Sequence, residues 1–147
     1  ALPIWKGEYP LSRLFSGILP TDIPFAQDCM GAQFIYRDGN ILRLFAESNE
    51  IEDLQMSISV FLSNIESDAI GFLQLEPLQQ FYMNGGQLEP GQSLFVYPPF
   101  CFTESGTEVS LDSIDTIQYL LAHSRLAKAV SKALPGEKLD ISEIMLK

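Results

Sequence analysis

The chain has 147 residues, of which 46% are hydrophobic and 11% aromatic, as in one folded domain and unlike a disordered tail. Nineteen acidic residues against nine basic ones give a net charge of −10, which disfavours nucleic acid and anionic membranes and favours a basic partner. No run of about 18 apolar residues is present, and no positively charged start precedes an apolar core. Neither a membrane span nor a secretion signal is therefore expected.

The first 20 residues contain several Pro and Gly and the one Trp of the chain. They predict an irregular lead-in that docks on the domain, with one short helical turn around residues 11–15. The chain starts at Ala1 instead of a Met, so a segment upstream of it is expected.

A β-hairpin is predicted over residues 32–46. In the sequence FIYRDGNILRLF, the pair Asp38-Gly39 supplies the positive φ of a tight turn, and apolar runs flank it on both sides. The predicted strands are a short one in DIPFAQD, the two hairpin strands at 32–37 and 40–46, and a fourth around 51–54.

Both faces of this hairpin are apolar. Pairing across the turn sets Tyr36 opposite Ile41 and Phe34 opposite Arg43. The alternating residues Ile35, Leu42 and Leu44 point to the other face. A half-exposed hairpin would be polar on one face. We expect the following helix to cover one face and the C-terminal half of the chain to cover the other, with a bound partner as the alternative.

Two helices are predicted after the hairpin. The first begins at the N-cap Ser57, and one buried stripe at i, i+3, i+4, i+7 spacing is formed by Ile58, Phe61, Leu62 and Ile65. The second is short, with Pro77 in its first turn and Gly85-Gly86 at its end, and one face of it carries Leu78, Phe81 and Tyr82.

The C-terminal part begins with the apolar run LFVYPPFCF. Its prolines, Pro98 and Pro99, cannot both donate to a central ladder, so the run is predicted as an edge strand or a segment draped on the sheet or a helix. A long helix follows over about 113–134, with Asp112 and Asp115 at its positively polarised start. LPGEKLDI then leads into a short terminal strand.

The long helix carries two apolar stripes that lie about half a turn apart. The first stripe consists of Ile114, Ile117, Leu120 and Leu121, and the second of Leu126, Ala129, Val130 and Ala133. On the face of the first stripe, the later positions of the helix are basic: Arg125, Lys128 and Lys132. Either a kink near His123-Ser124 or burial of two different faces explains this pattern.

No catalytic constellation is visible. The one His, His123, stands in mid-helix, which favours a packing or surface role over that of a base. Cys29 and Cys101 lie in apolar surroundings and are too few for a disulfide framework or a metal cluster, so they predict buried, reduced thiols in a cytosolic protein. No metal, cofactor or enzymatic activity is expected. A cryptic hydrolase that uses Cys29 or His123 is the alternative.

The densest acidic cluster follows the hairpin and consists of Glu47, Glu50, Glu52 and Asp53. One interpretation is a solvated rim; the other is a surface that captures a basic protein.

Several short motifs follow one another over residues 23–65. They are the strand and turn PFA-x-D-x-x-G with Asp28 and Gly31, the hairpin turn Asp38-Gly39, an acidic strand at 50–54 and a Ser-initiated helix at 57–65. In this order the segment resembles the SUKH superfamily, which includes fungal cell-wall-assembly regulators and bacterial immunity proteins. Residues from about 70 to 147 look like the C-terminal extension of a bacterial branch. The family normally opens with two helices carrying an LP-x-x-Y type motif, and none precedes Trp5.

The resemblance implies a single α+β domain over 1–147, with a twisted, mainly antiparallel sheet packed by helices. It also implies a non-enzymatic role. Bacterial members commonly bind a cognate toxin domain, often a nuclease, as its antidote. A regulatory scaffold of cell-envelope synthesis, like the fungal relatives, is the alternative.

We therefore predict that a basic toxin domain is the partner and that an acidic rim on the hairpin captures it. Opposite charges speed association, whereas a few buried and often aromatic anchors supply affinity. The predicted interface is the acidic set Asp38, Glu47, Glu50, Glu52 and Asp53, with Tyr36 and Tyr82 as anchors.

Overall fold

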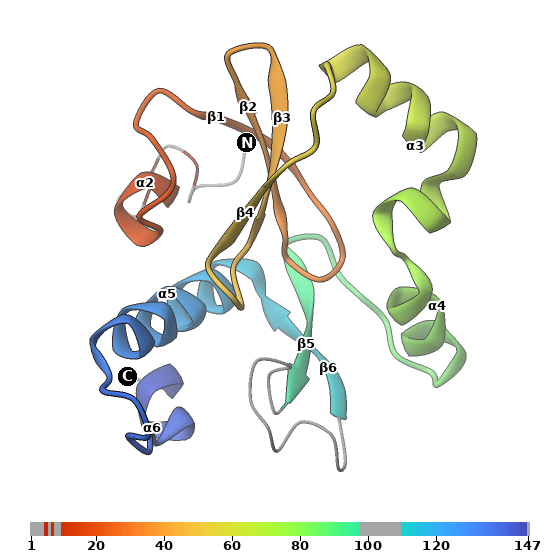
Figure 1. Cartoon of the computed structure of the whole chain (residues 1–147). Helices are drawn as coiled ribbons and strands as arrows, with labels where there is room; N and C mark the ends of the chain where they lie inside the picture. The colour runs from red at the N-terminus through yellow and green to blue at the C-terminus, as the bar shows by residue number, and fades with distance from the viewer. Residues whose placement is uncertain (1–4, 6, 8–9, 98–109, 147) are drawn as a thin grey trace.

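In the computed structural model, which describes residues 5, 7, 10–97 and 110–146, the predicted hairpin is the centre of a four-stranded antiparallel sheet (Figure 1). The strand order follows the chain, β1-β2-β3-β4. The strands are β1 (Ile23–Gln27), β2 (Gln33–Arg37), β3 (Asn40–Phe45) and β4 (Glu50–Asp53). The predicted register is confirmed, because Tyr36 pairs with Ile41 and Phe34 with Arg43. The turn residue Asp38 has a φ of 49°.

Both faces of the hairpin are buried, as predicted. On one face, Phe34 and Ile41 pack against Phe61 of helix α3 (Ile58–Leu73). On the other, Ile35, Leu42 and Leu44 pack against Tyr119 and Leu120 of helix α5 (Thr116–Lys132) and against the lead-in residues Leu11, Leu14 and Phe15. The C-terminal half therefore covers the second face together with the docked lead-in, whose short helix α2 (Leu11–Leu14) lies where it was predicted.

The predicted stripe on α3 is wrong in two of its four residues. Ser57 caps the helix as expected, because its hydroxyl accepts a hydrogen bond from the Val60 N–H. Phe61 is 1% exposed, but Ile58 is 42% and Leu62 is 56% exposed. The helix bends at Asp68, where the backbone is not helical. The bend lets Phe72 contact the Phe61 ring, so one aromatic cluster takes the place of a continuous stripe.

Helix α4 (Glu76–Met83) follows, with Pro77 in its first turn as predicted. Strand β5 (Gln92–Tyr97) then pairs with β6 (Ser110–Asp115) in a second, two-stranded antiparallel sheet. The predicted edge strand is thus confirmed as far as Tyr97. Pro98, Pro99 and Cys101 lie outside the described residues.

Two predictions for the C-terminal part are wrong, one on where the long helix begins and one on the type of the last element. The long helix begins at Thr116 and not at 113, because residues 110–115 pair with β5, and Asp115 then caps the helix through the Ile117 and Gln118 N–H groups. The predicted terminal strand is instead a helix, α6 (Ile141–Leu146). The Asp140 carboxylate accepts a hydrogen bond from the Glu143 N–H and stabilises the start of this helix.

The two apolar stripes of α5 reflect a broad buried face. Ala122, His123, Ser124 and Leu126 are all buried, and no residue inside the helix departs from helical geometry. Burial of two faces, and not a kink, therefore explains the pattern as far as Leu126. Val130 is 51% exposed, and the basic residues Arg125, Lys128 and Lys132 are exposed. The fold class is α+β with a long C-terminal helix, as predicted.

Candidate partner-binding groove

The predicted acidic rim is divided between two faces of the sheet. Side chains alternate along a strand, so the cross-strand partner of each residue reports its face. Glu50 pairs with Phe45 and Glu52 pairs with Arg43, on the face that α3 covers. Asp53 pairs with Leu42 and points to the opposite face.

Asp38 and Asp53 come together at the far end of the hairpin. They line a small hollow of about 330 Å³ together with Arg37 and Asn40. The Asp53 carboxylate accepts a hydrogen bond from the Gln55 N–H, 2.8 Å away. These two acids are therefore separate from Glu50 and Glu52.

The two predicted aromatic anchors do not meet the acidic residues. Tyr36 is partly buried and packs against the cluster around Phe61. Tyr82 is 49% exposed on α4, where its ring centre lies 6.5 Å from that of Phe81.

A groove runs between the sheet and the junction of α3 with α4, and Arg43, Phe45 and Gln74 divide it into two clefts. The inner cleft has a volume of about 650 Å³ and is lined by Asp28, Met30, Glu47, Glu76, Pro77 and Tyr119, among others. The outer cleft has a volume of about 710 Å³ and adds Glu50, Ile51, Glu52, Leu54 and Phe72. The groove thus brings together Glu47, Glu50 and Glu52 of the predicted interface.

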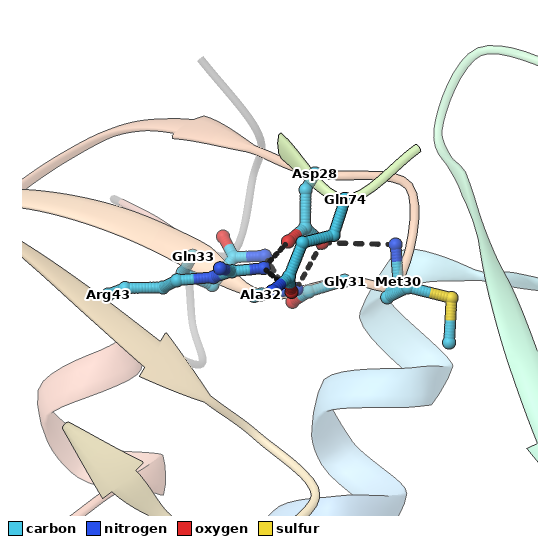
Figure 2. A network of polar contacts seen from close by, with 7 residues as sticks. All are labelled: Asp28, Met30, Gly31, Ala32, Gln33, Arg43 and Gln74. Atoms are coloured by element: carbon cyan, nitrogen blue, oxygen red, sulfur yellow. Dashed lines mark hydrogen bonds and ion pairs between the residues drawn. The ribbon is translucent and has the colours of Figure 1, made fainter. Parts of the chain in front are cut away.

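An ion pair between Arg43 and Asp28 lies in the lining of the inner cleft, and Figure 2 shows its polar contacts. Arg43 Nη2 donates to Asp28 Oδ2 at 2.7 Å and to Gln74 Oε1 at 3.3 Å. The other oxygen, Asp28 Oδ1, accepts hydrogen bonds from the Met30 and Ala32 N–H groups. The turn that presents these donors is closed by a hydrogen bond from the Gly31 N–H to the Asp28 carbonyl, and Gly31, its last residue, has a φ of 81°; a Cβ there would also meet the Tyr119 ring.

Burial governs the electrostatics of this pair. Asp28 is 5% and Arg43 is 8% exposed. Burial raises the pKa of the Asp28 carboxyl above its usual range, although the charge and hydrogen bond of Arg43 and the two N–H donors act in the opposite direction. The Arg43 guanidinium also lies 4.7 Å from the Phe45 ring centre and 5.6 Å from that of Phe34.

Sequence reasoning did not identify this pair as a site. In the sequence, Asp28 belongs to the motif that resembles the SUKH superfamily, and Arg43 is predicted only as the cross-strand partner of Phe34. A signal was present, because Arg43 alternates with the apolar residues Ile41 and Phe45 on a buried face. A buried guanidinium requires a counter-ion.

The groove favours cations. Among the described residues, five carboxylates line it, at Asp28, Glu47, Glu50, Glu52 and Glu76, and the ion pair with Asp28 balances the charge of Arg43. Apolar side chains, including Phe45 and Phe72, lie between these acids.

The residues of the alternative hydrolase are packed inside the domain. His123 is 1% exposed, its Nδ1–H donates to the Tyr119 carbonyl at 2.9 Å, and burial lowers its pKa. Burial, with the nearby charge of Asp28, raises the pKa of the Cys29 thiol to about 11, so the thiolate is scarce at neutral pH. The predicted packing role of His123 and the buried thiol of Cys29 are confirmed.

Two further features concern the described part of the chain. Within it, no group of three or more His, Cys, Asp and Glu side chains is placed to hold a metal ion. None of the helices in the same residues combines the length and apolarity needed to cross a membrane.

No protein-family model, curated protein or solved structure matches the chain. The resemblance to the SUKH superfamily therefore stays a prediction from the sequence. The groove and the charges around it are the structural features that bear on function.

Proposed function

We propose that this chain is a non-enzymatic cytosolic binding protein, an immunity protein that neutralises a basic toxin domain by direct binding. The observation that carries the proposal is the groove, where carboxylates surround apolar side chains and the one guanidinium is already paired. This is the surface chemistry that complements a cationic protein.

The groove supplies both parts of such an interaction. Glu50 and Glu52 are exposed on the edge strand β4, where they attract an approaching cationic surface over roughly 10 Å at physiological salt. Phe45 and Phe72 are partly buried beside them and offer apolar area for anchors of the partner.

A toxin that acts on nucleic acid fits this arrangement well. Such a protein binds phosphates through Lys and Arg side chains. An acidic groove that covers those side chains competes with the substrate for the same charges. Occlusion of the substrate-binding side chains of the toxin then explains its neutralisation without any chemical reaction by this chain. The buried positions of His123 and Cys29 are in keeping with this.

The division of the acidic residues between two faces provides a matched test. We predict that Glu50→Gln with Glu52→Gln slows association with the toxin domain encoded by a neighbouring gene severalfold at about 20 mM NaCl. The difference should narrow at about 300 mM NaCl, where screening is stronger. Asp38→Asn with Asp53→Asn removes the same charge from the opposite side and should leave association near that of the unaltered chain. Stopped-flow kinetics and a toxicity-rescue assay measure the two effects.

Two outcomes would contradict the proposal. Equal slowing by both double variants would mean that overall acidity, and not the groove, attracts the partner. Absence of binding to every neighbouring gene product would remove the immunity role. Binding to an envelope-synthesis protein in its place would favour the regulatory scaffold.

A further inference from the structure

The inner cleft is large enough to admit a long side chain, and part of its wall is apolar. Its volume of about 650 Å³ lies within the range of roughly 300–1,000 Å³ that is typical of pockets for small organic groups. Met30, Phe45, Pro77 and Tyr119 contribute apolar wall, against which the methylene groups of a long side chain can pack.

The charges of the cleft select a cation. Asp28 and Arg43 form an ion pair and balance each other. Of the two further acids in the lining, Glu47 already takes part in another interaction, and Glu76 leaves the formal charge of the lining negative. An anionic group that entered would be repelled, and a cationic one attracted.

Arg43 provides a second, independent observation. It lies in the wall that the two clefts share, it is 8% exposed, and its Nε is buried without an acceptor among the described residues. Its Nη2, in contrast, serves both Asp28 and Gln74. A buried donor without an acceptor is unfavourable, so an entering group that also carries a carbonyl oxygen gains by approaching this wall.

We propose that the inner cleft receives a single arginine side chain of the protein partner, with the adjoining peptide carbonyl directed at the Arg43 wall. This inference rests on the proposed function, in which the partner is basic. Arginine fits better than lysine, because its planar guanidinium stacks on aromatic rings and binds carboxylates through two parallel hydrogen bonds.

The unaltered chain can be tested without a known partner. We expect capped arginine (N-acetyl-arginine N-methylamide), titrated into the ¹⁵N-labelled chain, to shift the amide signals of Ala32, Phe45 and Gln74 in a saturable way. Capped citrulline has nearly the same shape without the charge and should bind about tenfold more weakly. Capped lysine should bind with intermediate strength.

A pair of charge-matched variants locates the site. The double variant Glu47→Gln with Glu76→Gln should lower the affinity for capped arginine about fivefold. Glu66→Gln with Glu89→Gln removes the same charge from residues that do not line the groove and should leave binding unchanged. The comparison of arginine with citrulline needs no variant, so it decides the matter even if a variant fails to fold.

The inference is overturned if citrulline binds as well as arginine, or if the shifted signals lie outside the inner cleft. Its failure is distinguishable from that of the proposed function. A toxin domain that binds Glu47→Gln/Glu76→Gln with unchanged affinity refutes the arginine site and leaves the immunity role intact. Saturable arginine binding in the cleft, without any toxin partner, supports the site and removes the immunity role.

Discussion

Arg43 occupies a strand position between Ile41 and Phe45 at which an apolar side chain would be expected. The position tolerates arginine because Asp28 supplies a carboxylate at 2.7 Å and Gln74 a further acceptor. Removing one partner of a buried ion pair leaves the other charge without compensation. The pair is thus a requirement for the native state as well as a feature of the groove.

This requirement predicts the effect of neutralising Asp28. Asp28→Asn keeps an oxygen for the Met30 and Ala32 N–H groups but removes the charge that Arg43 needs. We expect the free energy of unfolding to fall by about 3–5 kcal/mol, measured by urea titration.

Asp53→Asn is the matched control for that change, because exposed Asp53 also accepts a backbone hydrogen bond but has no ion pair in the described structure. It should change the free energy of unfolding by about 0.5 kcal/mol or less. Similar losses for the two variants would show that the charge of Asp28 contributes little to stability.

Phe61 is the buried residue of helix α3, at the centre of its contact with the sheet. The Phe61 ring lies 4.9 Å from that of Phe34, 5.4 Å from that of Phe72 and 5.6 Å from that of Phe25, measured between ring centres. The helix thereby positions Phe72 and Gln74, which line the outer cleft. Packing at Phe61 and the shape of the groove are therefore linked.

Neighbouring substitutions on α3 should differ sharply in their effect. Phe61→Ala should lower the free energy of unfolding by about 3–5 kcal/mol, because it opens a cavity among three aromatic rings. Leu62→Ala, at a side chain that is 56% exposed, should cost about 1 kcal/mol or less. Chemical denaturation of both variants measures the contrast. If Leu62→Ala lowered the free energy of unfolding more than Phe61→Ala, the buried stripe predicted from the sequence would be favoured instead.

At the scale of the whole molecule, charge repulsion opposes folding. Nineteen acidic residues and a net charge of −10 are confined to a domain of 147 residues. Such a charge keeps the protein soluble but destabilises the compact state through self-repulsion. Association with a basic partner would relieve this repulsion.

Added salt should therefore stabilise the isolated chain. Raising NaCl from about 20 to 300 mM should raise the melting temperature by a few degrees, because the shorter screening length weakens repulsion among exposed carboxylates. KCl should give the same gain if the effect is screening and not specific ion binding. A lower melting temperature in salt would instead mean that attractive pairs such as Arg37–Asp22 outweigh the repulsion.

The sequence by itself determined the centre of the fold. Turn chemistry at Asp38-Gly39 and strand alternation set the hairpin register, and the apolar character of both faces required two covering layers. These features follow from residues close together in the chain, so local propensity and periodicity are sufficient to predict them. The same alternation, applied to β4, could have shown that Asp53 faces away from Glu50 and Glu52.

Only the tertiary structure decided the groove and the ends of several elements. The ion pair joins residues 15 positions apart, and the contact with Gln74 spans 31 positions, so no local pattern marks them as neighbours. Ile58 and Leu62 fit a helical stripe but are exposed, whereas Phe72, which lies beyond the bend in α3, packs against Phe61. Periodicity identifies the side chains that share one face of a helix. Which of these side chains are buried depends on the neighbouring elements that pack on that face in the tertiary structure.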